Sequence, residues 1–279
     1  MMKNLSILLA ATLFLPQITA LAQPKPPRLI GSATSSGDVF LAGGYSKEKG
    51  WFFDQTARAL VKPGTKWRLA RLDGSALSLT TGKVTEGEGV GGFVALSTRA
   101  NAAPSDISDA ATQEMLALSN VPNAQPRRAR VQGLKAPIYA SEAKKLLSRA
   151  GLKVKIANLT QLVRVDLNGD GREEALFCAR SRADFGKTPE TRVGDYNLVA
   201  LRCLVNGKVK TLPLMVETNK KASAFGAPNR SEIMACADID GDGKMEIVVS
   251  TGYYEGWGME IWTFDGKSVK RVLSAGWGA

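Results

Sequence analysis

Two stretches of the chain place acidic or amide side chains on alternate residues, which is the arrangement of a loop that holds a hard cation. Each spans nine residues, 166–174 and 238–246, with oxygen-bearing side chains at positions 1, 3, 5 and 9. Calcium takes six to eight oxygens at about 2.3–2.6 Å, and a tight loop can aim oxygens from alternate residues at one centre. The predicted side-chain ligands are Asp166, Asn168, Asp170 and Glu174 in the first loop, and Asp238, Asp240, Asp242 and Glu246 in the second.

Two further positions of each loop support the same chemistry. Position 6 is glycine in both loops, Gly171 and Gly243, which permits a backbone turn that a side chain would obstruct. Position 7 is Arg172 or Lys244, and there we expect the backbone carbonyl rather than the side chain to face the cation. We therefore predict one calcium ion in each loop. The alternative is a pair of Asp-Gly-rich turns that bind nothing, and the presence of two copies argues against it.

The two loops differ from an EF-hand, which shares the first half of the pattern. An EF-hand requires a glutamate at position 12 and lies between two helices. Position 12 is Phe177 in the first loop and Val249 in the second. The residues after each loop are aliphatic, β-branched or aromatic, as is typical of strands. We therefore expect metal loops that connect strands.

The loops resemble the calcium loops of FG-GAP/VCBS repeats, which are known from integrin α-chain propellers and many secreted bacterial proteins. The resemblance rests on Asp-x-Asn-x-Asp-Gly-x-x-Glu and Asp-x-Asp-x-Asp-Gly-x-x-Glu, each before a short apolar strand, and covers residues 161–279. It implies antiparallel four-stranded blades of the propeller type, with calcium between the first two strands. The family commonly has aspartate at position 9, where this chain has glutamate. The family includes adhesion, scaffold and lectin-associated proteins as well as accessory modules of enzymes, so it implies no single activity.

The elements around the loops repeat in the same order. Each unit reads as strand, metal loop, strand, connection, strand, turn and strand, with third strands at Asn197–Val205 and Met259–Phe264. The turns contain Asn206-Gly207 and Asp265-Gly266, the strongest signals for a two-residue hairpin. Two units cannot close a propeller, which usually has at least four blades. Either an N-terminal module caps the pair, or the units form an open β structure.

The start of the chain has the features of a secretory signal over residues 1–22. Lys3 precedes an apolar stretch, Leu5 to Leu15, that is too short to span a bilayer, and Ala20-Leu21-Ala22 is a small-x-small cleavage site. We therefore expect an exported protein, periplasmic or secreted, with no transmembrane segment after cleavage. Its aqueous environment would supply calcium.

Residues 23–100 are predicted to form a small β-rich module. Strands are expected at 39–42, 51–53, 67–70 and 93–96, with turns at 43–44, 73–74 and 81–82 and a short helix over 54–61. Residues 101–137 contain four prolines and are interpreted as a linker with a possible helix over 108–118. The repeat domain follows at 138–279. It begins with a helix over 142–149, which Ser141 would cap and Gly151 would end.

Composition limits the function. The net charge of +11 favours anionic partners, such as glycans, lipopolysaccharide or phospholipid headgroups, although a basic surface can also serve solubility alone. No dense run of lysine and arginine supports nucleic-acid binding. The chain has no histidine, which removes Ser-His-Asp and Cys-His catalysis and histidine-bound zinc. We therefore favour a non-enzymatic function.

The three cysteines, Cys178, Cys203 and Cys236, are predicted to be buried thiols. An odd number leaves at least one of them unpaired. If Cys178 faces Leu198 in a hairpin, Cys203 lies about 17 Å further along the strand. A disulfide requires Cα atoms within about 7 Å of each other.

An aromatic, glycine-rich segment follows the second metal loop. Tyr253, Tyr254 and Trp257 could stack on a sugar ring while Glu255 binds hydroxyl groups, but the favoured interpretation of these residues is turn and core packing. Glu255 and Glu260 could also form a glycosidase pair, which needs a separation of about 5–9.5 Å. The sequence thus predicts an exported calcium-binding module or scaffold for glycans or other anionic envelope components. The alternatives are a carbohydrate-active enzyme or its accessory module, and a purely structural envelope protein.

Overall fold

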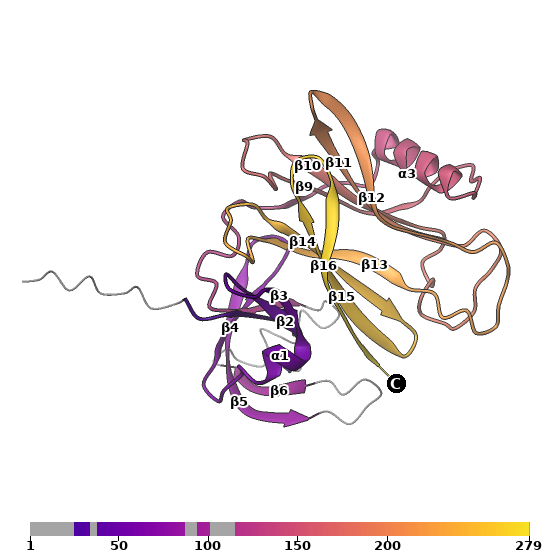
Figure 1. Cartoon of the computed structure of the whole chain (residues 1–279). Helices are drawn as coiled ribbons and strands as arrows, with labels where there is room; N and C mark the ends of the chain where they lie inside the picture. The colour runs from indigo at the N-terminus through magenta and orange to yellow at the C-terminus, as the bar shows by residue number, and fades with distance from the viewer. Residues whose placement is uncertain (1–24, 34–37, 87–93, 101–114, 279) are drawn as a thin grey trace, which may run out of the picture.

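The computed structural model describes residues 25–33, 38–86, 94–100 and 115–278, and they form mainly antiparallel β-structure. Three sheets of seven, five and four strands are accompanied by two helices in the described residues, α1 (Asp54–Arg58) and α3 (Pro137–Arg149) (Figure 1). None of the helices in this part of the chain is long and apolar enough to cross a membrane. The predicted signal segment, residues 1–22, lies outside the described residues.

The second repeat unit forms the four-stranded sheet, in the chain order that the sequence predicts. Its strands are β13 (Arg230–Ala237), β14 (Glu246–Tyr253), β15 (Gly256–Phe264) and β16 (Val269–Gly278). The predicted two-residue Asp-Gly turn is wrong. Residues 265–268 all lie in the turn, because the Asp265 carboxylate accepts hydrogen bonds from the backbone N–H groups of Lys267 and Ser268 and only Gly266 has a positive φ.

The first repeat unit forms the same meander, extended by one short strand. The strands are β9 (Leu159–Val165), β10 (Glu174–Arg180), β11 (Tyr196–Val205) and β12 (Lys208–Thr218), with β8 (Arg130–Val131) beside β9. Here the two-residue turn is confirmed, because Asn206 and Gly207 have φ values of 51° and 74°. Both four-strand units are open meanders, and the described strands form no closed propeller.

The register of the β10–β11 pair differs by one residue from the prediction, because Cys178 lies opposite Val199 rather than Leu198. The consequence for the cysteines is unchanged, since Cys203 lies further along β11 and pairs with Lys210 of β12. All three cysteines are buried and free. The prediction of buried thiols is therefore confirmed.

The seven-stranded sheet contains most of the N-terminal module. Its strands are β1 (Arg28–Ala33), β2 (Val39–Ser46), β3 (Gly50–Phe53), β4 (Lys66–Ala70), β5 (Ala76–Glu86), β6 (Val94–Ala100) and β7 (Met115–Ser119). The four predicted strands are present, but two predicted turns lie inside strands. Gly43-Gly44 belongs to β2, where a Cβ at Gly43 would overlap the carbonyl oxygen of Phe52 in the neighbouring strand. Thr81-Gly82 lies at an irregularity in β5, and the Thr81 hydroxyl accepts the indole N–H of Trp67 at 2.7 Å.

The predicted linker contributes to the fold. Residues 115–118 are strand rather than the end of a helix, because β7 fills the gap between β1 and β4 and all of its residues are buried. The remainder of the helix predicted over 108–118 falls outside the described residues. The next helix, α3, begins four residues before Ser141, with Pro137 in its first turn, and Gly151 follows it with a φ of 86°. Proline suits this position because the first N–H of a helix has no partner within the helix.

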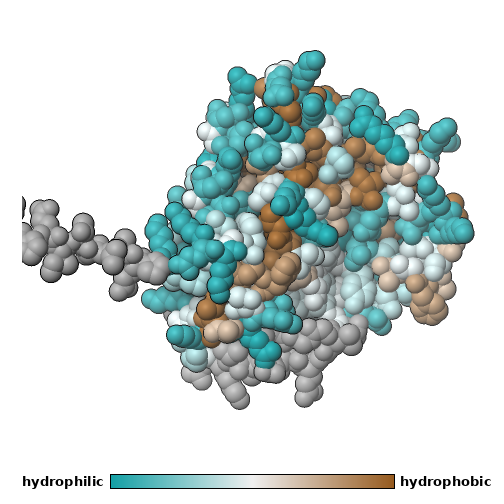
Figure 2. Space-filling model, in the orientation of Figure 1, coloured by the Kyte–Doolittle hydropathy of each residue, from teal (hydrophilic) through white to brown (hydrophobic). Residues whose placement is uncertain are grey.

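The three sheets stack in layers, with the four-stranded sheet in the middle (Figure 1). One core joins β9–β12 to the middle sheet and includes Val165, Leu201 and Ile247. A second core joins the middle sheet to the N-terminal sheet. Helix α3 packs on the outer face of β10 and β11 through Leu146 and Leu147, so that β11 is covered on both sides. Apolar atoms also reach the surface in a band across the middle of the face shown in Figure 2.

Candidate metal centre

The two acidic loops occupy equivalent places, one between β9 and β10 and the other between β13 and β14. Their backbones are held by the same set of hydrogen bonds from N–H groups to side-chain oxygens. In the second loop, Asp238 accepts from Gly241 at 2.7 Å, Asp240 from Asp242 at 3.0 Å and Asp242 from Lys244 at 2.7 Å. The carboxylate at position 9, Glu246, accepts from Ile239 at 2.7 Å.

The first loop repeats these contacts position by position. Asp166 accepts from Gly169 at 2.7 Å, Asn168 from Asp170 at 3.1 Å and Asp170 from Arg172 at 2.8 Å. Glu174 accepts from Leu167 at 2.9 Å. The shared contacts show that the two copies of the motif specify one loop conformation.

Glycine is required at two positions of each loop rather than one. Position 6 has a positive φ in both copies, as predicted, with 81° at Gly171 and 89° at Gly243. Position 4 also has a positive φ, with 78° at Gly169 and 77° at Gly241. Side chains other than asparagine rarely adopt this conformation, so the Gly-x-Gly spacing is part of the loop signature.

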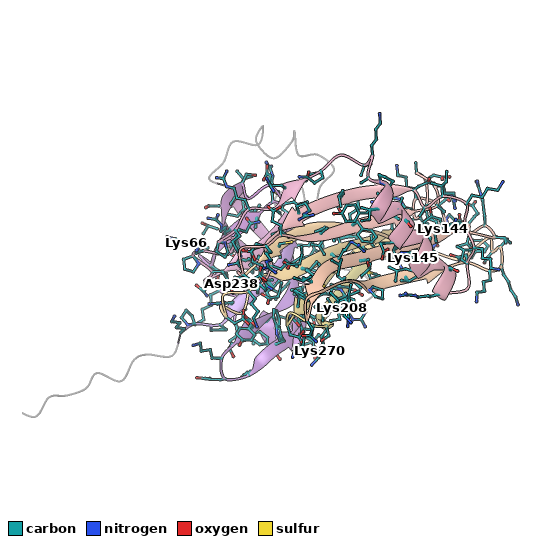
Figure 3. The ribbon with its side chains drawn as sticks, turned by 90° about the horizontal axis from the view of Figure 1, so that it is seen from above. Lys66, Lys144, Lys145, Lys208, Asp238 and Lys270 are labelled. Atoms are coloured by element: carbon teal, nitrogen blue, oxygen red, sulfur yellow. The ribbon has the colours of Figure 1, made fainter. Side chains whose placement is uncertain are left out.

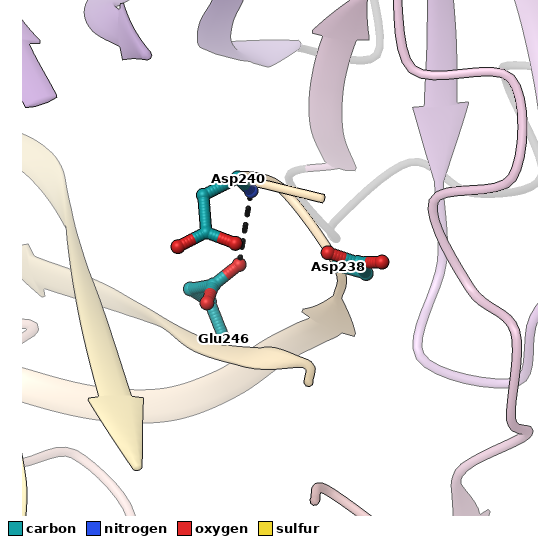
Figure 4. Close-up of side chains that lie close together, drawn as sticks. All are labelled: Asp238, Asp240 and Glu246. Carbon is teal, nitrogen blue, oxygen red and sulfur yellow. Dashed lines mark hydrogen bonds between the residues drawn. The ribbon is translucent and has the colours of Figure 1, made fainter. Parts of the chain in front are cut away.

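The second loop brings three predicted ligands together. Carboxylate oxygens of Asp238, Asp240 and Glu246 all lie within 4.8 Å of one another (Figure 4). Two oxygens on opposite sides of one calcium ion are separated by about 5 Å, twice the bond length of about 2.3–2.6 Å. The three oxygens therefore fit the shell of a single ion, and an all-oxygen donor set is the type that calcium prefers.

The electrostatics of the second loop show crowded negative charge. Burial, together with the nearby Asp240 carboxylate, raises the pKa of Glu246 to about 8. Burial and the charges of Asp242 and Asp238 raise the pKa of Asp240, which the nearby Arg28 lowers in part. A divalent cation at this place would stabilise the charged form of both carboxylates and so oppose the effects of burial and of the neighbouring charges.

The remaining predicted ligands are less closely gathered. Within the described residues, no second cluster of three acidic groups is found, so the first loop lacks an equivalent of the 4.8 Å group. Its Glu174 is buried like Glu246, and burial followed by the charges of Asp170 and Asp166 raises its pKa. In the second loop the Asp242 side chain is 47% exposed and lies 3.8 Å from the ammonium of Lys244.

Each loop is braced by an arginine from another part of the chain. Arg127 donates to the carbonyl oxygens of Asp166 at 2.6 Å and Leu167 at 3.1 Å, and its guanidinium packs on Gly169. Arg28 donates to the carbonyl oxygen of Ile239, and a Cβ at Gly241 would overlap its guanidinium.

Sequence reasoning missed both braces. Nothing in the sequence around Arg28 or Arg127 marks them as partners of the loops, and only the glycine at position 4 of each loop hints at a close neighbour. The acidic group itself lies at the opposite end of the sheets from Lys144 and Lys145 of α3, as the position of Asp238 shows in Figure 3.

The aromatic segment after the second loop is a tight hairpin rather than an open loop. Tyr253 pairs with Gly256, so Tyr254 and Glu255 form the turn, and Tyr254 is 38% exposed. Trp257 lies edge-on to Phe40 of β2, with 4.8 Å between the ring centroids, and packs against the core shared by two sheets. The three predicted sugar-stacking residues are thus in different environments: Tyr253 ends β14, Tyr254 lies at the tip of the hairpin and Trp257 lies in a packed layer.

Glu255 and Glu260, the two acids considered for glycoside hydrolysis, also lie in different environments. Glu260 is buried and accepts hydrogen bonds from Arg271 at 2.6 Å and from the indole N–H of Trp262 at 3.0 Å. Glu255 lies in the hairpin turn. The buried Glu260 carboxylate of β15 is therefore held in an ion pair with Arg271 of β16.

No protein-family model, curated protein or solved structure matches this chain. The resemblance to calcium-binding repeats consequently rests on the loop residues alone.

Proposed function

We propose that the chain is a calcium-binding module in which each acidic loop holds one calcium ion. The observation that carries this proposal is the convergence of Asp238, Asp240 and Glu246 within 4.8 Å in a loop whose hydrogen bonds recur in a second copy. The side-chain ligands are Asp166, Asn168, Asp170 and Glu174 in the first site, and Asp238, Asp240, Asp242 and Glu246 in the second. The carbonyls of Arg172 and Lys244 complete the proposed sets.

The proposed role of the ions is structural, because both loops connect neighbouring strands and touch each other. The N–H of Met245 donates to the carbonyl oxygen of Leu167 at 2.8 Å, which joins the second loop to the first. Calcium would replace carboxylate repulsion within each loop by attraction to one centre. With about 1 mM calcium and a dissociation constant of about 10⁻⁴ M, mass action adds about 1.4 kcal/mol of stability per site.

At the finer level, we propose that the two meanders are blades of the FG-GAP/VCBS type in an exported, periplasmic or secreted protein. The matching order of strands and loops supports this assignment. The net charge of +11 supports a scaffold or binding function toward anionic envelope components or glycans. Calcium is plentiful outside the cytoplasm, which suits sites in the affinity range of extracellular modules.

A melting experiment tests the calcium proposal. Addition of a chelator to the calcium-loaded protein is expected to lower the melting temperature by about 5–10 °C if both sites empty. Magnesium should restore little of this loss, because it prefers a smaller octahedral shell with several waters. If neither chelator nor added calcium changes the melting temperature, the proposal is wrong.

A glycan array probed with and without calcium separates the functional alternatives. Calcium-dependent binding without turnover supports a binding module. Product formation would instead indicate a carbohydrate-active enzyme, and absence of any signal would favour a structural envelope protein.

A further inference from the structure

A cavity of about 460 Å³ lies beside the second acidic loop, on the side of the N-terminal sheet. Its wall includes Asp240 of the loop, the segment 25–28 before and at the start of β1, and the turn between β2 and β3. Pockets for small molecules typically measure about 300–1,000 Å³, so the cavity has room for one small ligand. Nothing in the calcium proposal uses this space.

The lining has an apolar part. The rings of Tyr45 and Phe52 and the side chain of Leu60 contribute to it, together with Pro26 and Pro27. Phe52 is buried, whereas Leu60 is 38% exposed although it is a large apolar side chain. An apolar ligand body placed here would cover Leu60 and gain the free energy of removing apolar surface from water.

The rim has an excess of positive charge. Lys25, Lys47 and Lys49 line the cavity and are exposed, and no ion pair engages them among the residues that the structure describes. Arg28 also lines the cavity, but its guanidinium already binds the carbonyl of Ile239. The opposing charges in the lining are Glu48 and Asp240. The rim therefore favours an anion, and Asp240 is the opposing charge that the loop contributes to the lining.

We propose that this cavity binds a small amphipathic anion, a molecule with one anionic head group on an apolar body, and that calcium in the second loop strengthens the binding. The calcium dependence rests on the proposed function, because an ion held by Asp240 would offset its repulsion of the ligand. Since such coupling is reciprocal, the anion would tighten calcium binding by the same factor.

The probe for the test is the dye 1-anilinonaphthalene-8-sulfonate, which carries a sulfonate on an apolar body. The neutral dye N-phenyl-1-naphthylamine has the same aromatic body without the charge and serves as the matched probe. Fluorescence titrations with the folded protein are expected to show the anionic dye binding more tightly than the neutral one. Equal affinity for the two dyes would overturn the proposal of an anion site.

Charge reversal locates the site. Lys47→Glu combined with Lys49→Glu should weaken binding of the anionic dye about tenfold and leave the neutral dye unchanged. The matched control reverses Lys208 and Lys270, two exposed lysines on other hairpins (Figure 3). This control should bind the anionic dye like the unaltered protein. Equal weakening in both double variants would show a general charge effect and overturn the assignment to this cavity.

The second part of the experiment measures how calcium changes the affinity for the dye. In the unaltered protein, calcium is expected to tighten binding of the anionic dye several-fold. In Asp240→Asn the dye should bind more tightly than in the unaltered protein when calcium is absent, and added calcium should change its affinity less. If dye binding in the unaltered protein depends on the lysines but is unchanged by calcium, the proposed coupling is wrong, whereas the proposed anion site is still supported. If calcium fails to bind at all, the lysine variants still decide the anion site, so the two proposals can fail separately.

Discussion

The guanidinium of Arg127 donates to the carbonyl oxygen of Gly243 at 2.8 Å, although the two residues belong to different parts of the fold. The same side chain holds the carbonyl oxygens of Asp166 and Leu167 in the first loop. One cation from the segment before β8 therefore joins both acidic loops. This side chain adds to the backbone hydrogen bond from Met245 to Leu167, which also joins the two candidate calcium sites.

Replacement of Arg127 by methionine is the first prediction. The variant keeps much of the apolar stem and removes three hydrogen bonds from a charged donor that is 24% exposed. We expect a loss of about 2 kcal/mol in the free energy of unfolding, measured by urea denaturation in calcium.

The neighbouring Arg128→Met is the matched control for that variant. Arg128 is exposed and adjacent to Arg127 in the chain, so its replacement should change the free energy of unfolding by no more than about 0.5 kcal/mol. Equal stabilities of the two variants would show that the contact between loops is energetically neutral.

A ligand exchange between the loops is the second prediction. Position 3 is Asn168 in the first loop and Asp240 in the second, and the added carboxylate should make the second site the tighter one. Asn168→Asp should strengthen the first site and Asp240→Asn should weaken the second, each by roughly tenfold. Calcium titration of both variants measures the two shifts, and shifts in the same direction would contradict the assigned ligand roles.

Substitutions at position 5 of the loops, Asp170 and Asp242, test through stability whether the second site binds calcium more tightly than the first. Asp242→Ala should remove more calcium-dependent stability than Asp170→Ala, because it disables the tighter site. The reverse order would indicate that the first loop dominates calcium binding.

The aromatic hairpin gives the third prediction. Trp257 packs against Phe40 and Trp277, so Trp257→Ala should cost about 2–4 kcal/mol of stability. Tyr254→Ala at the exposed turn should change it by less than about 0.5 kcal/mol. Thermal melts of the two variants test this contrast. If Trp257→Ala abolished glycan binding with no loss of stability, Trp257 would be a ligand contact instead of a packing residue.

Thiol reactivity gives the fourth prediction, with its pH dependence. Burial raises the pKa of Cys178 and of Cys236 to about 12, and that of Cys203 to about 11. The reactive thiolate is therefore scarce in the native protein up to about pH 9, where an ordinary exposed thiol is largely ionised. A colorimetric thiol reagent should react with none of the three cysteines in the folded protein and with all three after denaturation.

An engineered exposed thiol, Ser274→Cys, is the control for reagent access, since Ser274 is exposed on β16. It should react at once at pH 8. Native cysteines that react as fast as this control would show that the cores around them open readily.

The order of strands around the loops was predictable from the sequence because local signals agreed. The acidic loops, the apolar runs after them and the Asn206-Gly207 turn each act within a few residues, and together they define both meanders. The register of β10 against β11 was off by one because side chains on both faces are apolar, so the alternation that normally fixes register is absent.

The N-terminal sheet and the loop braces were not predictable in the same way. The dipeptide Gly43-Gly44 locally predicts a turn. In the fold, the absence of side chains there lets the backbone of β2 lie close to Phe52 and Arg28 in the neighbouring strands. The strand β7 lies in a segment with a proline-rich composition, and only its pairing with β1 and β4 makes it a strand. The braces of Arg28 and Arg127 are contacts across long sequence separations, of which a single sequence carries no direct signal.

Isothermal titration of the chelator-treated protein with calcium, with magnesium as the comparison, tests the two-site proposal most directly. Two calcium ions per chain are expected to bind with dissociation constants of about 10⁻⁴–10⁻³ M, and magnesium should bind much more weakly. In Asp240→Asn the second site should weaken about tenfold, so that the two sites bind calcium with similar affinity. No calcium binding in the millimolar range would contradict the central claim.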